Sequence, residues 1–187
     1  MMGWVVLAAV AVGIFWIIAK YNGLIQLKNQ VANGWKQIDV QLKRRHDLIP
    51  NLVSTVKGVM SFEQETLEKV VAARSAAMGA RGAADAAVKE NALTDALSKF
   101  FVVVEQYPQL RSSENVRQLQ EELTSTENKL AFARQFYNDI ATKFNIAQQV
   151  FPANIIAQMF GFRAAELFEI TVEAERAVPK VDLSLSK

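Results

Sequence analysis

The residues of this chain that could do chemistry centre on its one histidine, His46, which stands in a charged run between Lys43 and Asp47. A metal site needs several converging ligands, and because the sequence contains no cysteine, His46 would have to recruit carboxylates such as those of Asp47 and Glu63. An exposed histidine, or one at a helix end, is the simpler interpretation. We therefore predict no metal site and no cofactor.

The sequence also lacks the motifs of covalent and phosphate chemistry. It contains neither G-x-S-x-G nor H-E-x-x-H, and Gly79 and Gly82 are not followed by the Gly-Lys-Ser/Thr of a phosphate-binding loop. We predict that the protein is not an enzyme and has no catalytic residues, and we identify no small-molecule substrate. The alternative is an unrecognised catalytic site around residues 45–47 and Glu63.

Three adjacent basic residues, Lys43, Arg44 and Arg45, are the candidates for a nucleic-acid or lipid contact. Neighbouring positions of a helix point about 100° apart, so the three side chains spread around the circumference instead of forming one patch. We therefore predict no nucleic-acid binding. Arg45 continues the apolar stripe of its helix, and a buried charge needs a partner. Glu63, at an inward position of the next helix, is the predicted partner in a structural ion pair.

The element that comes before all of these residues is the uncharged segment from Gly3 to Ala19. As a helix, this segment covers about 25 Å, which is near the short end of what crosses a hydrocarbon core. The aromatic residues Trp4, Trp16 and Tyr21 are suited to the two membrane interfaces, and Lys20 closes the run with a charge. We predict a single transmembrane anchor.

Two features distinguish this anchor from a cleaved signal sequence. No Lys or Arg precedes the apolar run, and residues 17–19 do not form a small-residue cleavage site. Positive charges follow the span, so the body is expected in the cytoplasm and a short N-terminus outside. Lys20 and Lys28 come soon after the span, and we expect them to contact the lipid headgroups of the membrane surface.

Beyond the anchor the sequence predicts helices throughout, because Pro and Gly are sparse and no strand-like alternation persists. The first segment has an amphipathic stripe, and Pro50 predicts a break or kink just before it. A second helix follows, in which Glu63 and Arg74 fall at inward positions. A loop is expected from Gly79 to Asp85, and a third helix from about Asp85 to Tyr107.

The fourth helix has the clearest pattern, with mostly apolar residues spaced alternately by three and four from Val116 to Ala147 and only Thr126 breaking the stripe. A period near 3.5 residues over this length predicts left-handed, coiled-coil packing. A short helix from Ala153 to Phe160 and a last helix from about Arg163 to Ala177 are expected to follow.

These elements predict an all-α protein: an N-terminal transmembrane helix, then an elongated antiparallel (up-and-down) four-helix bundle with short C-terminal helices. The predicted division of the chain is a transmembrane anchor over residues 1–20, a helical bundle over 21–179 and a flexible tail over 180–187.

Asparagine is prominent at the helix ends and along the fourth helix. Some of these residues are expected to cap helices or to form turns. Those inside the helix either connect neighbouring helices by side-chain hydrogen bonds or face solvent. The residues concerned are Asn22, Asn51, Asn115, Asn128, Asn138 and Asn145.

Short motifs in a fixed order identify a family. They are Tyr21-Asn22, Asp39-Val-Gln-Leu-Lys-Arg-Arg45 running into Asp47-Leu-Ile-Pro-Asn-Leu52, Glu105-x-Tyr107-Pro-x-Leu110, Glu114-Asn115, Glu127-Asn128, Ala133-Arg134-x-x-Tyr137-Asn138, Asn145, Phe151-Pro152 and Phe160-Gly161-Phe162. With these motifs the chain resembles the LemA family over residues 21 to about 181. The ending Pro179-Lys-Val-Asp-Leu183 departs from the family pattern, in which Phe follows the Asp.

The resemblance implies a bacterial inner or plasma membrane protein with a very short outside N-terminus and a cytoplasmic antiparallel helical bundle. It implies no reaction, substrate or cofactor.

We therefore expect a non-enzymatic, membrane-anchored scaffold or adaptor that assembles with itself or with another membrane protein. Phe132 and Phe136 lie beside the main stripe of the fourth helix and are the predicted oligomer interface. The alternative is a lipid-interacting or membrane-shaping protein at the inner face of the membrane. It would use Lys20, Lys28 and the apolar residues from Phe160 to Phe162.

Overall fold

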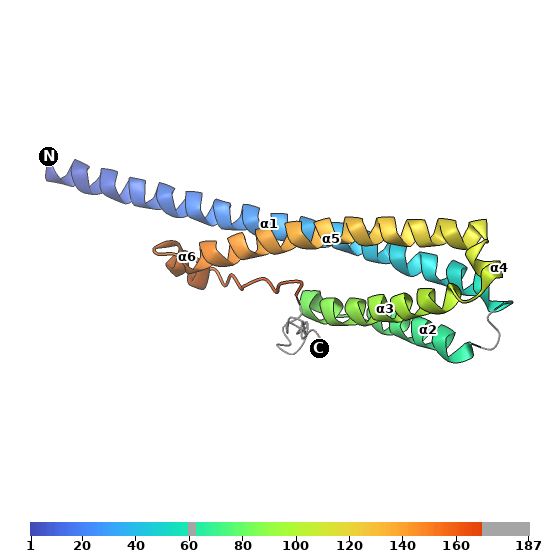
Figure 1. The fold of residues 1–187 in the computed structure, drawn as a ribbon. Helices are drawn as coiled ribbons and strands as arrows, with labels where there is room; N and C mark the ends of the chain where they lie inside the picture. Colours follow the sequence, from blue (N-terminus) through green and yellow to red (C-terminus); the bar gives the residue numbers. More distant parts are fainter. Residues whose placement is uncertain (60–62, 170–187) are drawn as a thin grey trace, which may run out of the picture.

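The computed structural model describes residues 1–59 and 63–169, and regular structure in this part of the chain is entirely helical. The all-α class is therefore confirmed (Figure 1). The helices are α1 (Met2–Lys57), α2 (Gln64–Met78), α3 (Gly82–Val104), α4 (Pro108–Arg111), α5 (Glu114–Gln149) and α6 (Ala153–Met159).

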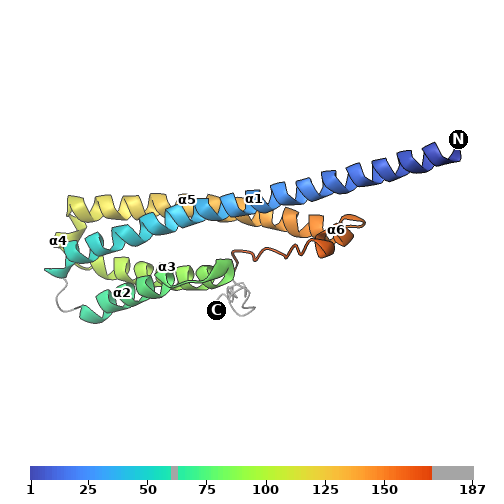
Figure 2. The same cartoon turned by 180° about the vertical axis from the view of Figure 1, so that it is seen from behind.

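The long helices lie in two pairs. Helix α5 runs beside α1 in the opposite direction, and α2 and α3 form a second pair that lies along the distal half of α1 (Figures 1 and 2). The buried face of α5 follows the predicted stripe, because residues three and four apart share one side of a helix. Leu130 and Phe100, both fully or almost fully buried, belong to the two main clusters of the core.

The N-terminal part of α1 projects beyond the other helices (Figures 1 and 2). Among the described residues, α1 is the one helix long and apolar enough to cross a membrane, and none of its most apolar window is buried. The helix continues without interruption into the bundle. The predicted anchor and the first helix of the bundle are therefore a single element.

Pro50 does not break α1, which continues to Lys57, so the predicted break is wrong. A proline inside a helix lacks the N–H that would bond to the carbonyl four residues earlier, here that of His46. Arg74 of α2 supplies the missing donor: its Nε donates to the His46 carbonyl oxygen at 2.7 Å. The inward position of Arg74 thus compensates for the proline.

The chain after α6 also differs from the prediction. Residues 162–167 form no helix, although a last helix was expected from about Arg163. They run along α5, where side chains of that helix hold their backbone groups (Figure 1). The rest of that expected helix and the predicted tail over 180–187 lie outside the described residues.

Candidate functional site

A buried cluster of charges connects three helices near the middle of the bundle. Arg45 of α1 donates from Nη1 to Glu90 Oε2 of α3 at 3.1 Å, and the same Nη1 lies 3.1 Å from Glu127 Oε2 of α5. Nη2 of Arg45 donates to Thr94 Oγ1 at 2.7 Å. The predicted partner, Glu63, instead accepts a hydrogen bond from the Tyr107 hydroxyl at 3.2 Å. The ion pair is therefore corrected from Arg45–Glu63 to Arg45–Glu90.

His46 belongs to the same cluster. Its Nε2 lies 2.7 Å from Glu90 Oε1, and its side chain is almost completely buried, so the expected exposed or helix-end position is wrong. Glu90 thus uses one carboxylate oxygen for Arg45 and the other for His46, and it has no exposed surface. No group of three possible metal ligands occurs among the residues that the structure describes.

Arg134 of α5 extends the cluster and balances its charge. Its Nη1 lies 3.5 Å from Glu127 Oε1, and its guanidinium lies 4.7 Å from the centre of the Phe168 ring. Burial lowers the pKa of Arg134, and repulsion from Arg45 acts in the same direction. Attraction to Glu127 and Glu90 opposes both effects.

This geometry makes the cluster a buried structural connection between α1, α3 and α5. Buried ions are tolerated when opposite charges and hydrogen bonds compensate the loss of water. Arg45 and Glu90 have both, whereas Glu127 and Arg134 are compensated mainly by opposite charge, because Glu127 Oε2 and Arg134 Nε and Nη2 make no hydrogen bond. The Nε2 of His46 is held by Glu90, so this ring nitrogen takes part in the buried network.

A second polar arrangement, which we call the amide clamp, consists of the side chains of Asn138 and Asn145. The Asn145 amide donates to the Ala165 carbonyl at 2.9 Å and accepts from its N–H at 2.8 Å. Asn138 makes the same pair of bonds with Phe168, at 3.1 and 2.8 Å. Each asparagine therefore imitates the backbone of a neighbouring β-strand.

The spacing of the amide clamp follows from elementary geometry. Seven residues of helix, from Asn138 to Asn145, rise about 10.5 Å. Three residues of extended chain, from Ala165 to Phe168, cover about 10 Å. The two distances match, so the two asparagines can contact two backbone positions of the extended segment without strain.

Tyr137 and Gly82 both lie against Glu166 of the same segment. The Tyr137 hydroxyl donates to the Glu166 carbonyl at 2.7 Å, and burial, followed by the nearby Glu166 carboxylate, raises the pKa of Tyr137. Gly82 has a φ of 82°, and a Cβ there would lie 2.6 Å from Glu166 Oε2. The backbone angle therefore favours glycine, whereas the Glu166 carboxylate could move away from a Cβ.

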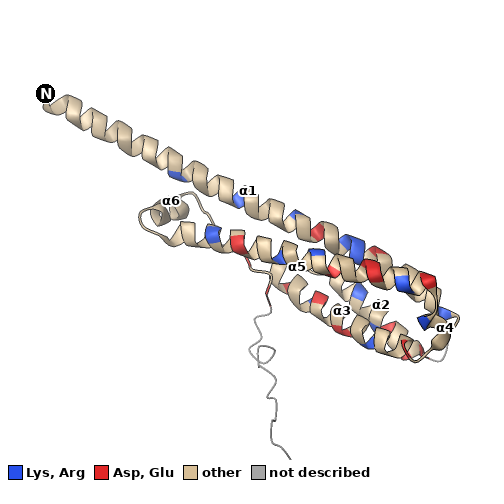
Figure 3. Ribbon diagram, turned by 45° about the horizontal axis from the view of Figure 1, so that its top comes forward, with Lys and Arg blue, Asp and Glu red and all other residues tan. Residues whose placement is uncertain are grey.

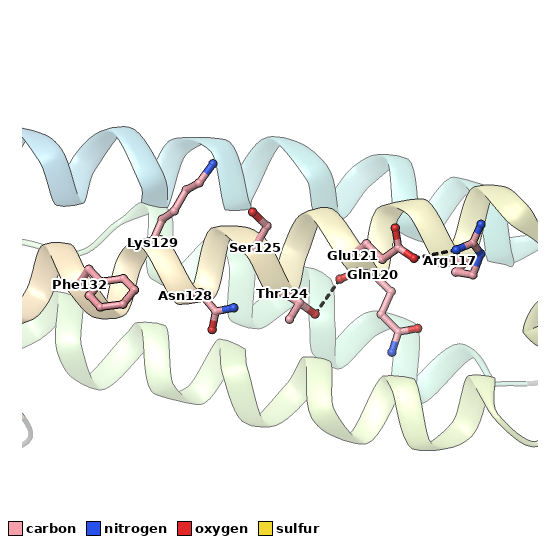
Figure 4. A pocket seen from close by; sticks show the side chains of 8 residues that line it. All are labelled: Arg117, Gln120, Glu121, Thr124, Ser125, Asn128, Lys129 and Phe132. Atoms are coloured by element: carbon pink, nitrogen blue, oxygen red, sulfur yellow. Dashed lines mark hydrogen bonds and ion pairs between the residues drawn. The ribbon is translucent and has the colours of Figure 1, made fainter.

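The predicted interface residues Phe132 and Phe136 lie on the outer side of α5, where 74% and 46% of their surfaces are exposed. Phe132 stands at one end of a shallow cleft of about 640 Å³ that extends along α5 to Arg117 (Figure 4). A second cleft of about 620 Å³ lies between α5 and α1 and includes both phenylalanines and Val40. The structure thus brings the two phenylalanines together on one open surface.

The predicted membrane-surface residues, Lys20 and Lys28, are exposed on α1. Lys20 Nζ lies 5.8 Å from the centre of the Trp16 ring, a cation–π arrangement typical of a membrane interface. The two lysines stand just beyond the apolar part of the helix. Their contact with lipid stays a prediction.

Sequence reasoning missed Glu90, although the sequence carried a signal for it. Glu90 precedes Leu93 by three residues and Leu97 by seven, so it continues the apolar stripe of the third helix. A charge in such a stripe needs a buried partner, as was argued for Arg45. Asn138 and Asn145 were expected to bond to neighbouring helices or to face solvent, but they bond to the backbone of a non-helical segment, which the sequence did not predict.

A family profile and one relative point to the same family. The sequence profile described as "LemA family" matches residues 34–183. The chain is 26% identical to Protein LemA of Metamycoplasma hominis over 179 residues, which cover 94% of this chain and 80% of that protein. The matched region contains the charge cluster, the amide clamp and both outer phenylalanines.

Magnetosome proteins are a second group of relatives. The chain is 24% identical to Magnetosome protein MamQ 2 of Paramagnetospirillum magneticum over 181 residues, covering 82% of this chain and 66% of that protein. For Magnetosome protein MamQ of Magnetospirillum gryphiswaldense the values are 23% over 178 residues, 81% and 65%. These relatives and the apolar N-terminal helix indicate a membrane-associated protein.

Proposed function

The chain belongs to the LemA family, and from this membership and the apolar start of α1 we propose a non-enzymatic, membrane-anchored scaffold whose helical body assembles with copies of itself. The observation that carries this proposal is the exposed aromatic surface on α5. Large apolar side chains that stand together on a water-facing surface favour a partner, because covering them removes apolar area from water. Phe132 and Phe136 are the centre of that surface.

The outer face of α5 extends the surface toward the membrane. Ile146 and Val150 are also exposed, and at about 100° per residue both fall within about 40° of Phe132 around the helix. Asp139 and Lys143 lie between the apolar pairs on this face, four residues apart. A second copy that presents the same face meets apolar with apolar, which is the self-complementarity that a symmetric dimer requires.

The membrane anchor favours this assembly. Copies held in one bilayer meet in the same orientation and at the same height, so their outer faces meet in register at a raised effective concentration. We propose that residues 1–20 form the anchor and residues 21–179 the bundle, with its four long helices antiparallel and coiled-coil-like. We also propose that the bundle lies on the cytoplasmic side of a bacterial inner membrane, as the lysines after the span favour.

The test is the mass of the full-length protein in mild detergent, beside that of the double variant Phe132→Ala/Phe136→Ala. We expect a defined multimer for the wild type and a monomer for the variant. The matched control is Val88→Ala/Val102→Ala, which removes exposed apolar side chains from α3. This control should leave the multimer intact, and circular dichroism should show equal helix content for all three proteins.

A wild-type monomer contradicts self-assembly, and a double variant that keeps a multimeric wild-type mass contradicts the interface at Phe132 and Phe136. A monomeric wild type would direct the search to a different membrane protein as the partner. It would leave the membrane anchor and the fold untouched.

A further inference from the structure

The membrane-proximal end of the bundle contains an unusually long stretch without charge. No Asp, Glu, Lys or Arg occurs from Phe144 to Phe162, between Lys143 and Arg163. This stretch includes the end of α5 and all of α6 (Ala153–Met159). Figure 3 shows that charges are spread along the bundle, whereas α6 and the first part of α1 have none. Two uncharged regions, distant in sequence, therefore occupy the same end of the molecule.

The register of α1 and α5 gives the height of this end relative to the membrane. The two helices approach closely at Gly34, where a Cβ would lie 3.4 Å from Tyr137 Cα. Val150 lies thirteen residues beyond Tyr137, and Tyr21 lies thirteen residues before Gly34. Because both helices rise about 1.5 Å per residue and run in opposite directions, Val150 reaches the level of Tyr21. That is the level at which α1 leaves its apolar segment.

Helix α6 packs against α1 at this same level. Ile156 and Ala157 form a buried cluster with Leu24, and Trp16 inside the apolar segment packs against it. The Tyr21 ring lies 4.7 Å from the Phe160 ring. One side of α6 is thus bound to the helix that crosses the membrane.

The other side of α6 is uncovered and mostly apolar, although Gln158 is also exposed there. Ile155 and Met159 expose 56% and 63% of their surfaces, and Phe151, in the turn before α6, exposes 81%. Ile155 and Met159 are four residues apart, so they share one face of the helix. An apolar face beside a transmembrane segment, at the level where water gives way to lipid, is suited to the boundary between headgroups and acyl chains.

We propose that α6 and the turn before it are an interfacial membrane contact, inserted into the leaflet of the bilayer on the bundle's side, next to the protein's own anchor. The occupant of the exposed face of α6 is phospholipid. A second copy of the chain is the less favoured occupant, because lipid is present at this height whenever the anchor is in a membrane. The proposal does not depend on self-assembly through Phe132.

The absence of native cysteine makes a direct test possible. Ile155→Cys and Met159→Cys, each labelled with a small fluorophore, would be reconstituted as full-length protein in lipid nanodiscs with one copy per disc. The lipids would bear nitroxide quenchers near the start of their acyl chains. Phe132→Cys is the matched control, because it is also an exposed apolar position on the same protein.

We expect quenching at residues 155 and 159 that is several-fold stronger than at residue 132. Raising the salt concentration should leave this quenching unchanged, because the inserted face has no charge. All labelled positions are exposed, so the substitutions should keep the wild-type helix content, which circular dichroism would check.

Equal quenching at all three positions would overturn the proposal, as would its absence at 155 and 159. If the labels at 155 and 159 become shielded from water only when several copies share one nanodisc, a second copy covers α6 and the proposal is wrong. Each of these results is independent of the mass measured for the phenylalanine variants.

Discussion

The charge cluster and the amide clamp satisfy buried polar groups in different ways. In the cluster, ions from three helices neutralise one another, and Glu90 is fully buried. In the clamp, the neutral amides of Asn138 and Asn145 bond to the backbone of a segment at the edge of the molecule. Losing one ion leaves an opposite charge without water, whereas losing one amide leaves groups that water can reach. The cluster should therefore govern global stability and the clamp local attachment.

Glu90→Ala tests the first half of this comparison and should have the largest effect. It leaves Arg45 and His46 buried without their shared partner, so we expect the free energy of unfolding to fall by about 3–5 kcal/mol. Denaturant titration of the full-length protein in detergent would measure this loss. Glu122→Ala, which removes the exposed partner of Arg44, is the control and should cost at most about 1 kcal/mol. Equal losses in Glu90→Ala and Glu122→Ala would show that the buried cluster stabilises the protein no more than an exposed ion pair does.

Arg74→Ala sharpens the comparison, because here a charged side chain satisfies a backbone group. We expect a loss of about 1–3 kcal/mol in the wild-type background, since the His46 carbonyl loses its donor. In the Pro50→Ala background the new N–H at position 50 can bond to that carbonyl, so the cost of Arg74→Ala should be smaller. A double-mutant cycle by denaturant titration measures the coupling. Costs that are equal in both backgrounds would refute the compensation.

The double variant Asn138→Ala/Asn145→Ala tests whether the amide clamp governs local attachment. Each substitution should cost only about 1 kcal/mol of global stability, because neutral hydrogen bonds contribute little net free energy. Locally the effect should be large: the N–H groups of Ala165 and Phe168 should exchange with solvent much faster, as hydrogen exchange would record. Asn128→Ala is the matched control, since Asn128 is exposed on the same helix. Unchanged exchange at both positions would show that the amide clamp does not hold the segment in place.

Tyr137→Phe has the smallest expected effect and a pH signature. At about pH 8 it removes one hydrogen bond to the segment, at a cost of about 1 kcal/mol. The pKa of Tyr137 in the folded protein is raised above its ordinary 10.0, so its contribution is complete below pH 10 and is lost as the pH rises through the higher folded value. The stability difference between wild type and variant should therefore shrink at about pH 11. A constant difference would contradict this assignment.

Local patterns predicted the helices well, and long-range partners less well. The stripe of α5 was legible because it depends only on residues three and four apart. The break at Pro50 was wrongly expected because the compensating donor, Arg74, comes from another helix. Arg45 was correctly expected to need a partner, but the sequence did not decide between Glu63 and Glu90, which depends on how the helices meet. The segment at 162–168 was expected to be helical, but its backbone bonds to the side chains of Asn145 and Asn138 instead.

The unbroken course of α1 has a mechanical consequence. Its 56 residues make a rod of about 84 Å with one end in the apolar segment and the other at the tip of the bundle. Transmembrane helices change their tilt when the thickness of the bilayer changes. A stiff lever converts such a change of angle into a lateral displacement that grows with distance from the membrane. The tip near Lys57 would thus move farthest. A change in the thickness of the bilayer would therefore produce motion at the far end of the protein.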